Sequence, residues 1–106
     1  MSFEETCKRI AEFTKERDWD QFHSPENLAK SIAIESGELL ECFQWSSEAN
    51  DEELKEELAD VMNYCIQLAQ KKGYDVCEII NSKIDKNEKK YPIDKSKGVS
   101  TKYDKL

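Results

Sequence analysis

The chain has 106 residues, of which 38% are hydrophobic and 37% are charged, and its net charge is −7. This length fits one domain. Because the apolar residues are few, they leave a slim core, and burial between subunits in an oligomer is therefore expected. An acidic chain with no broad basic surface is a poor candidate for binding nucleic acid polymers, and the lack of a long apolar run or a signal-peptide pattern predicts a cytoplasmic protein without membrane attachment.

Apolar periodicity predicts an almost wholly helical chain, which begins with a helix over residues 2–17. The apolar stripe of this helix is formed by Phe3, Cys7, Ile10 and Phe13. Residues 18–24 interrupt the pattern. Ser24 followed by Pro25 is typical of a helix start, because serine caps the first turn and proline suits the first helical position.

The second helix is expected to extend from Pro25 to about Trp45, and an acidic residue interrupts its apolar stripe. On a helical wheel Glu35 falls at the centre of the stripe, and Glu38 falls on its flank. An unpaired carboxylate in a buried stripe costs several kcal/mol, so Glu35 needs a partner. The stripe itself consists of Leu28, Ile32, Leu39, Cys42 and Phe43.

A third helix is predicted from about Asp51 to Lys72, after a polar stretch. Glu57, Asp60 and Tyr64 line one flank of its apolar face. That face consists of Leu54, Leu58, Val61, Cys65 and Leu68.

Gly73 is predicted to end the third helix and Asp75 to cap a fourth, which continues to Lys90. The stripe of the fourth helix consists of Val76, Ile79, Ile80 and Ile84. Residues 92–106 are expected to form an extended, mobile tail. No repeat or linker divides the chain, so a single domain over residues 1–106 is predicted.

The cysteines lack metal-site or disulfide spacing and are interpreted as small buried apolar residues: Cys7, Cys42, Cys65 and Cys77.

Four acids stand in two pairs with the same spacing, Glu35 with Glu38 and Glu57 with Asp60. Residues three apart share a helix face, so two adjacent helices would direct all four carboxylates to one place. Carboxylate oxygens suit a hard cation, and the pattern predicts a Mg²⁺ site.

Charge is also segregated along the chain. Residues 1–70 carry a net charge of −11, and residues 71–106 carry +4. A small phosphorylated ligand fits this arrangement, held between metal-loaded acids and C-terminal lysines. Aromatic side chains near the acids favour a nucleotide, because rings stack on bases, and Asn87 has an amide that can read a base edge. The candidate ring-bearing residues are Trp19, His23, Trp45 and Tyr64.

The two acidic motifs, Glu35-Ser-Gly-Glu38 and Glu57-Leu-Ala-Asp60, resemble the signature of the MazG-like all-α nucleoside triphosphate pyrophosphohydrolases. Further segments resemble the dCTP pyrophosphatase branch of that family, and the matches cover most of the chain. These segments are residues 17–23, 25–28, 43–45, 82–85, 87, 90–92 and 100–103. Ile34, where many MazG proteins have another Glu, fits this branch, whereas Ile10 departs from the His expected in its animal members.

The resemblance implies a four-helix bundle, assembled as a homodimer or homotetramer, that hydrolyses a nucleoside triphosphate, with dCTP as the expected substrate, to the monophosphate and pyrophosphate. Mg²⁺ is the implied cofactor, with Glu35, Glu38, Glu57 and Asp60 as its ligands. The substrate contacts implied or suggested by position are Trp19, Asp20, Gln21, Phe22, His23, Trp45, Tyr64, Lys83, Asn87 and Lys90.

Some assignments stay open from sequence. Glu38 is the candidate general base because it lies on the flank facing Glu57, although a metal site can work without a separate base. Lys83 and Lys90 are interpreted equally well as phosphate contacts or as solvated lysines.

The alternative function is a non-catalytic acidic helical module that binds a nucleotide or a protein, which would show no metal-dependent turnover. A di-iron bundle is excluded because it needs Glu-x-x-His pairs, and His23 is the only histidine.

Overall fold

The structure, a computed structural model, describes residues 1–106 and is all-helical, which confirms the predicted class. Four main helices are found, as predicted: α1 (Phe3–Glu16), α2 (Pro25–Glu41), α3 (Asp51–Lys72) and α4 (Val76–Lys90). Three shorter helical segments complete the chain: the 3₁₀ turn η1 (Asp20–Phe22), α5 (Ile93–Ser96) and the 3₁₀ turn η2 (Tyr103–Lys105). None of these helices combines the length and apolar composition that crossing a membrane requires.

The helix boundaries follow from side chains that cap backbone groups. Ser24 accepts a hydrogen bond from the backbone N–H of Asn27 at 3.1 Å, and Pro25 opens α2 as predicted. At the end of α3, Gly73 adopts a left-handed conformation with φ of 72°, which confirms the predicted stop. Asp75 caps α4 through the N–H of Glu78 at 2.8 Å.

The second helix ends four residues earlier than the sequence pattern predicts. The backbone N–H groups of Cys42, Phe43 and Gln44 each bond the carbonyl three residues back, so the chain tightens out of the α-helix after Glu41. Trp45 therefore lies in the connection to α3, and its side chain is 90% exposed.

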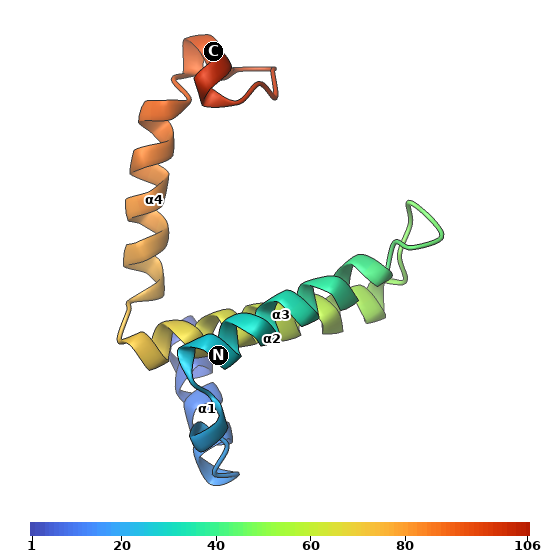
Figure 1. Ribbon diagram of the computed structural model, residues 1–106, viewed down its shortest axis with the longest axis vertical. Coiled ribbons are helices and arrows are strands. Elements are labelled where there is room, and N and C mark those ends of the chain that lie inside the picture. Colours follow the sequence, from blue (N-terminus) through green and yellow to red (C-terminus); the bar gives the residue numbers. More distant parts are fainter. The chain divides into compact units, whose positions relative to one another are not determined.

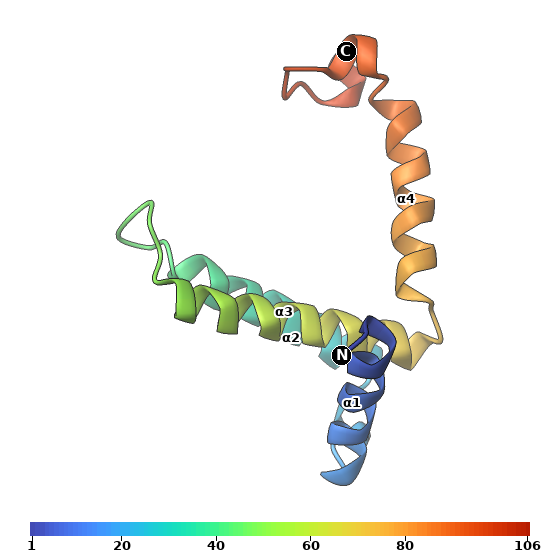
Figure 2. The ribbon, with the colours of Figure 1, turned by 180° about the vertical axis from the view of Figure 1, so that it is seen from behind.

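The contacts within the chain divide it into two compact units, residues 1–73 and residues 74–106. In the first unit α2 and α3 lie side by side as an antiparallel hairpin, and α1 crosses it where α2 begins and α3 ends (Figures 1 and 2). The most buried side chains come from all three helices at this crossing. They are Thr14, Leu28, Ile66 and Ala69.

Several side chains that the apolar pattern placed in the core are exposed. On α1, Phe3 and Phe13 are 49% and 45% exposed, because α1 meets the hairpin only at the crossing and buries Thr14 there. On α3, Leu58 and Cys65 are exposed and Ile66 and Ala69 are buried instead, since these two face the crossing.

The prediction that the four cysteines are buried is wrong. All are free thiols, and none belongs to the core. Cys7 and Cys42 are half-buried, and Cys65 and Cys77 are exposed.

The second unit contains α4, α5 and η2. The stripe of α4 is open to solvent in the single chain, with Ile79, Ile80 and Ile84 each about half exposed. The expected extended tail instead contains two helical turns, and Tyr103 packs edge-on against Tyr91 with ring centroids 6.2 Å apart. Mobility of the tail and a single domain over residues 1–106 stay predictions, as does a bundle built from all four helices.

Candidate metal and nucleotide site

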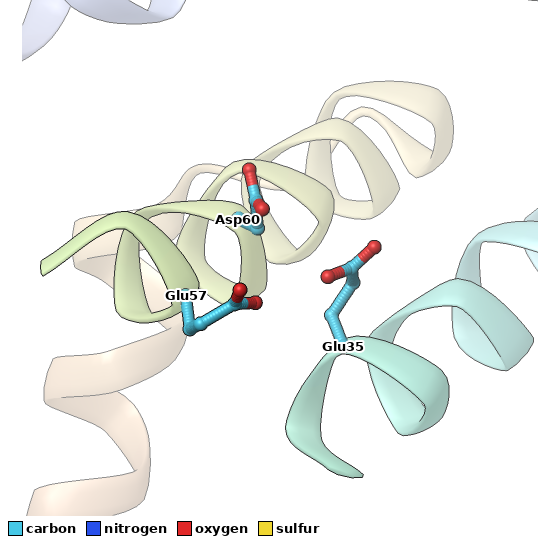
Figure 3. Close-up of side chains that lie close together, drawn as sticks. All are labelled: Glu35, Glu57 and Asp60. Atoms are coloured by element: carbon cyan, nitrogen blue, oxygen red, sulfur yellow. The ribbon is translucent and has the colours of Figure 1, made fainter. Parts of the chain in front are cut away.

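Three of the four predicted acids meet between α2 and α3. Glu35 on α2 faces Glu57 and Asp60 on α3 (Figure 3), and each offers an oxygen atom that lies within 4.8 Å of the other two. The i, i+3 spacing places Glu57 and Asp60 on one face of α3, and the antiparallel hairpin brings that face to Glu35. Glu38 is not part of this cluster of three, and its side chain is exposed.

Glu38 nevertheless affects the acids beside it. A hydrogen bond with Glu38 is the main cause that raises the pKa of Glu35 to about 7, followed by burial and by the charges of Glu38, Asp60 and Glu57. Burial, together with the charge of Glu38, also raises the pKa of Glu57. One carboxylate oxygen each of Glu35 and Glu57 is buried without a hydrogen-bond partner. The site thus concentrates negative charge that only protons or a cation can neutralise.

The residues present fit a hard divalent cation. All the donors are carboxylate oxygens, which suit Mg²⁺, and the two unpartnered buried oxygens of Glu35 and Glu57 are ready acceptors for an ion. A soft or imidazole-preferring metal is disfavoured, since no His or Cys belongs to the cluster.

The raised pKa of Glu35 gives the stability of the metal-free protein a defined pH dependence. Because the pKa is about 7 in the folded chain and 4.5 as the ordinary value, the folded state binds more protons between these two pH values. In EDTA, the stability of the wild type relative to Glu35→Gln should therefore fall as pH rises from about 4.5 to about 7, and then level off. Thermal unfolding followed by circular dichroism measures this difference.

The same experiment with Mg²⁺ tests the cation. Binding requires ionised acids, so Mg²⁺ should raise the melting temperature of the wild type at pH 8 much more than at pH 5, and should have less effect on Glu35→Gln. Parallel pH curves for the two proteins in EDTA would show that Glu35 does not titrate in this range.

Aromatic rings lead from the first helix to the face of α3 that carries the acids. The rings of Trp19 and His23 pack edge-on, with their centroids 6.4 Å apart. The rings of His23 and Tyr64 also pack edge-on, and their centroids are likewise 6.4 Å apart. Phe13 extends the row, with its ring 5.6 Å from that of Trp19. The structure therefore brings three of the predicted nucleotide contacts together one helical turn beyond Asp60.

The other predicted substrate contacts are more dispersed. Asp20 lines a cavity together with His23, whereas Gln21 bonds Asp18 and Phe22 is 61% exposed. Lys83, Asn87 and Lys90 belong to the second unit, where the Lys90 ammonium lies 4.8 Å from the centre of the Tyr103 ring. The roles of these three, and that of Trp45, stay predictions.

Two cavities lie beside α3, and each is lined by one residue of the aromatic row, Phe13 in the larger cavity and His23 in the smaller. The larger, about 490 Å³, is mostly apolar and is lined by Ile10, Phe13 and Met62 among others. None of the three clustered acids, Glu35, Glu57 and Asp60, lines this cavity. The smaller cavity, about 210 Å³, contains His23 and Gln67.

Sequence reasoning missed Gln67 and its neighbour Asn63. The Nε2 of Gln67 donates to the Oδ1 of Asn63 at 2.7 Å, in a partly buried position. The available signal was the spacing, because Gln67 is seven residues after Asp60 and three after Tyr64, and so shares their helix face.

An all-helical chain with clustered carboxylates between two antiparallel helices defines a candidate divalent-cation protein. The model of the MazG-like family matches residues 30–106, and the chain belongs to this family. A crystal structure of a pyrophosphatase from Archaeoglobus fulgidus is similar to this fold, with a TM-score of 0.76 and 40% identity over 84% of this chain and 91% of that one.

Curated relatives agree with this family. The chain is 41% identical over 113 residues to dCTP pyrophosphatase 1 of Rattus norvegicus and 38% identical over 113 residues to dCTP pyrophosphatase 1 of Homo sapiens. In both cases the match covers 96% of this chain and 66% of the relative. The chain thus spans slightly less than two thirds of the length of these relatives.

Proposed function

We propose that this protein is a Mg²⁺-dependent nucleoside triphosphate pyrophosphohydrolase, with dCTP as its preferred substrate. The observation that carries the proposal is the cluster of Glu35, Glu57 and Asp60 within 4.8 Å, one helical turn from an aromatic row. The names of its relatives, dCTP pyrophosphatase 1 and a pyrophosphatase, support the reaction and the substrate.

The reaction adds water across the bond between the α and β phosphates and releases a monophosphate and pyrophosphate. Glu35, Glu57 and Asp60 would hold Mg²⁺, which supplies neutralisation of phosphate charge and activation of water. Trp19, His23 and Tyr64 offer ring faces and edges that orient the nucleoside, so that the α phosphate reaches the acids.

Glu38 is the proposed proton acceptor for the attacking water. Its carboxyl group is exposed, and it raises the pKa of Glu35 and of Glu57, so it lies beside these acids without belonging to the closest cluster. A carboxylate in that position can take a proton while the other three hold the cation.

The protein is also proposed to be a homodimer or homotetramer that acts on free nucleotides. The exposed isoleucines of α4 and the exposed Phe3 and Phe13 of α1 support an oligomer, because burying such side chains stabilises an interface. The cytoplasmic location stays a prediction.

The test is hydrolysis of the eight common ribonucleoside and deoxyribonucleoside triphosphates, with and without Mg²⁺, with identification of the products. The expected result is Mg²⁺-dependent release of dCMP and pyrophosphate, with the highest kcat/KM for dCTP. Release of dCDP and phosphate would contradict the proposed bond cleavage. If no nucleotide is hydrolysed, the acids form a binding site only, and the non-catalytic module becomes the better interpretation.

A further inference from the structure

The turn after α1 contains a residue in a backbone conformation that is uncommon for its type. Asp18 has a φ of 56°, and it is the only residue other than glycine with a positive φ. Its N–H donates to the carbonyl of Lys15 at 3.1 Å, and the N–H of Trp19 donates to the carbonyl of Thr14 at 3.0 Å. These two bonds around a left-handed residue define a Schellman motif, whose left-handed position favours glycine. An aspartate at this position indicates that its side chain has a role of its own.

The side chain of Asp18 contacts the segment that follows the turn. The Nε2 of Gln21 donates to the Oδ2 atom of Asp18 and to its backbone carbonyl, each at 3.0 Å. A glycine would end α1 equally well, but it would lose the first of these two bonds. The carboxylate of Asp18 therefore connects the end of α1 to η1 in a way that ending the helix does not require.

The same turn places the first ring that follows α1. Trp19 comes directly after the left-handed residue, and its ring packs edge-on against that of Phe13, with the centroids 5.6 Å apart. An apolar contact between these two positions commonly accompanies a Schellman motif. The guanidinium of Arg17 lies 3.7 Å from the centre of the Phe13 ring and holds that ring in turn. The Trp19 side chain is still 43% exposed, so a ligand can reach it.

Bonds from other helices hold the later part of this segment. The Lys71 ammonium donates to the carbonyl of Asp20 at 3.3 Å, and the Asn27 amide donates to the carbonyl of Phe22 at 3.0 Å. Neither bond involves Trp19. The placement of this ring therefore depends on the left-handed turn and on its contact with α1.

We propose that Asp18 is a positioning residue for the nucleoside. Its hydrogen bond with Gln21 and its left-handed backbone hold the Trp19 ring in place. That ring begins the row that continues through His23 to Tyr64. The inference rests on the proposed function, and it adds a residue that keeps the aromatic row in its binding geometry without touching the nucleotide. Groups that are already in place strengthen binding, because less freedom is lost when the ligand arrives.

The experiment compares Asp18→Gly with Asp18→Asn, two variants that remove the same charge. Glycine suits the left-handed position, so this variant should melt close to the wild-type temperature, but it cannot accept a hydrogen bond from Gln21. Asparagine tolerates the left-handed conformation and keeps a side-chain oxygen that accepts from Gln21. With Mg²⁺, the KM for dCTP should rise at least about threefold in Asp18→Gly while kcat stays nearly unchanged, because binding rather than the chemical step is weakened. Asp18→Asn should have the wild-type KM.

A second measurement does not depend on turnover. Calorimetric titration with a dCTP analogue that carries a methylene group between the α and β phosphates gives the dissociation constant without hydrolysis of that bond. The dissociation constant should rise in Asp18→Gly and stay at the wild-type value in Asp18→Asn. Glu12→Gln is the control, because it removes an exposed carboxylate of α1 that forms no ion pair, and it should bind as the wild type does. Circular dichroism measures the melting temperature of each variant.

The outcomes separate this inference from the proposed function. If the wild type hydrolyses dCTP but Asp18→Gly has the same KM and dissociation constant, Asp18 only ends α1, and the inference is overturned while the activity stands. Equal losses in Asp18→Gly and Asp18→Asn also overturn it, because the charge rather than the hydrogen bond would then be responsible. A wild type that binds the analogue without hydrolysing dCTP overturns the proposed reaction, and the dissociation constants still decide the role of Asp18. If the wild type binds no nucleotide, both are overturned.

Discussion

Replacing Asp60 by alanine is expected to lower the rate of nucleotide hydrolysis by at least about 100-fold, because the variant loses an oxygen that holds the cation and places it on the phosphates. Asp60 is exposed and lies on the surface of α3, so alanine, a strong helix former, should leave the helical content unchanged. A pyrophosphate-release assay measures the rate, and circular dichroism measures the helix content. Glu35→Ala is expected to have the same effect.

The control is Glu52→Gln, which removes another carboxylate from the same helix. Glu52 is exposed and its nearest charge partner is the Lys55 ammonium at 3.4 Å, so its loss should leave hydrolysis near the wild-type rate. Wild-type turnover by Asp60→Ala would defeat the assignment of the metal ligands. An equal loss in both variants would show that overall charge, rather than this cluster, supports activity.

The second large effect concerns stability. Leu28→Ala should lower the free energy of unfolding by about 2–5 kcal/mol, because Leu28 is only 1% exposed and its removal leaves a cavity at the crossing of three helices. Since few side chains are fully buried in this chain, that loss is a large part of the total stability. Urea unfolding followed by circular dichroism measures the change.

Leu40→Ala provides the comparison on the same helix. Its side chain is 72% exposed, so the free energy of unfolding should change by less than about 0.5 kcal/mol. Similar losses in both variants would contradict the placement of the core at the crossing of the three helices.

Helix positions could be predicted from sequence because local signals encode them. Ser24 with Pro25, Gly73 and Asp75 each marked a boundary that the structure contains. The end of α2 was misplaced because apolar residues continue to Trp45, whereas the backbone already turns after Glu41. Apolar periodicity shows which face of a helix is apolar, but not how much of that face a neighbour covers.

The candidate site could be predicted in part for the same reason. Spacing identified Glu35, Glu57 and Asp60, because the two pairs stand out within single helices. The alignment of α2 against α3 decides which acids approach most closely, and it separates Glu38 from the cluster of three. The cavity that contains Gln67 was not predictable, since it forms only where α1 and η1 meet α3.

The α2–α3 hairpin also determines how the acidic site comes into being as the chain folds. The two helices are joined by the short connection of residues 42–50, so bringing them together loses little loop entropy and depends on contacts that are local in sequence. When α2 pairs with α3, the carboxylates of Glu35, Glu57 and Asp60 are therefore brought close together. Their mutual repulsion opposes formation of the hairpin, and protons or a cation that neutralise the acids favour it.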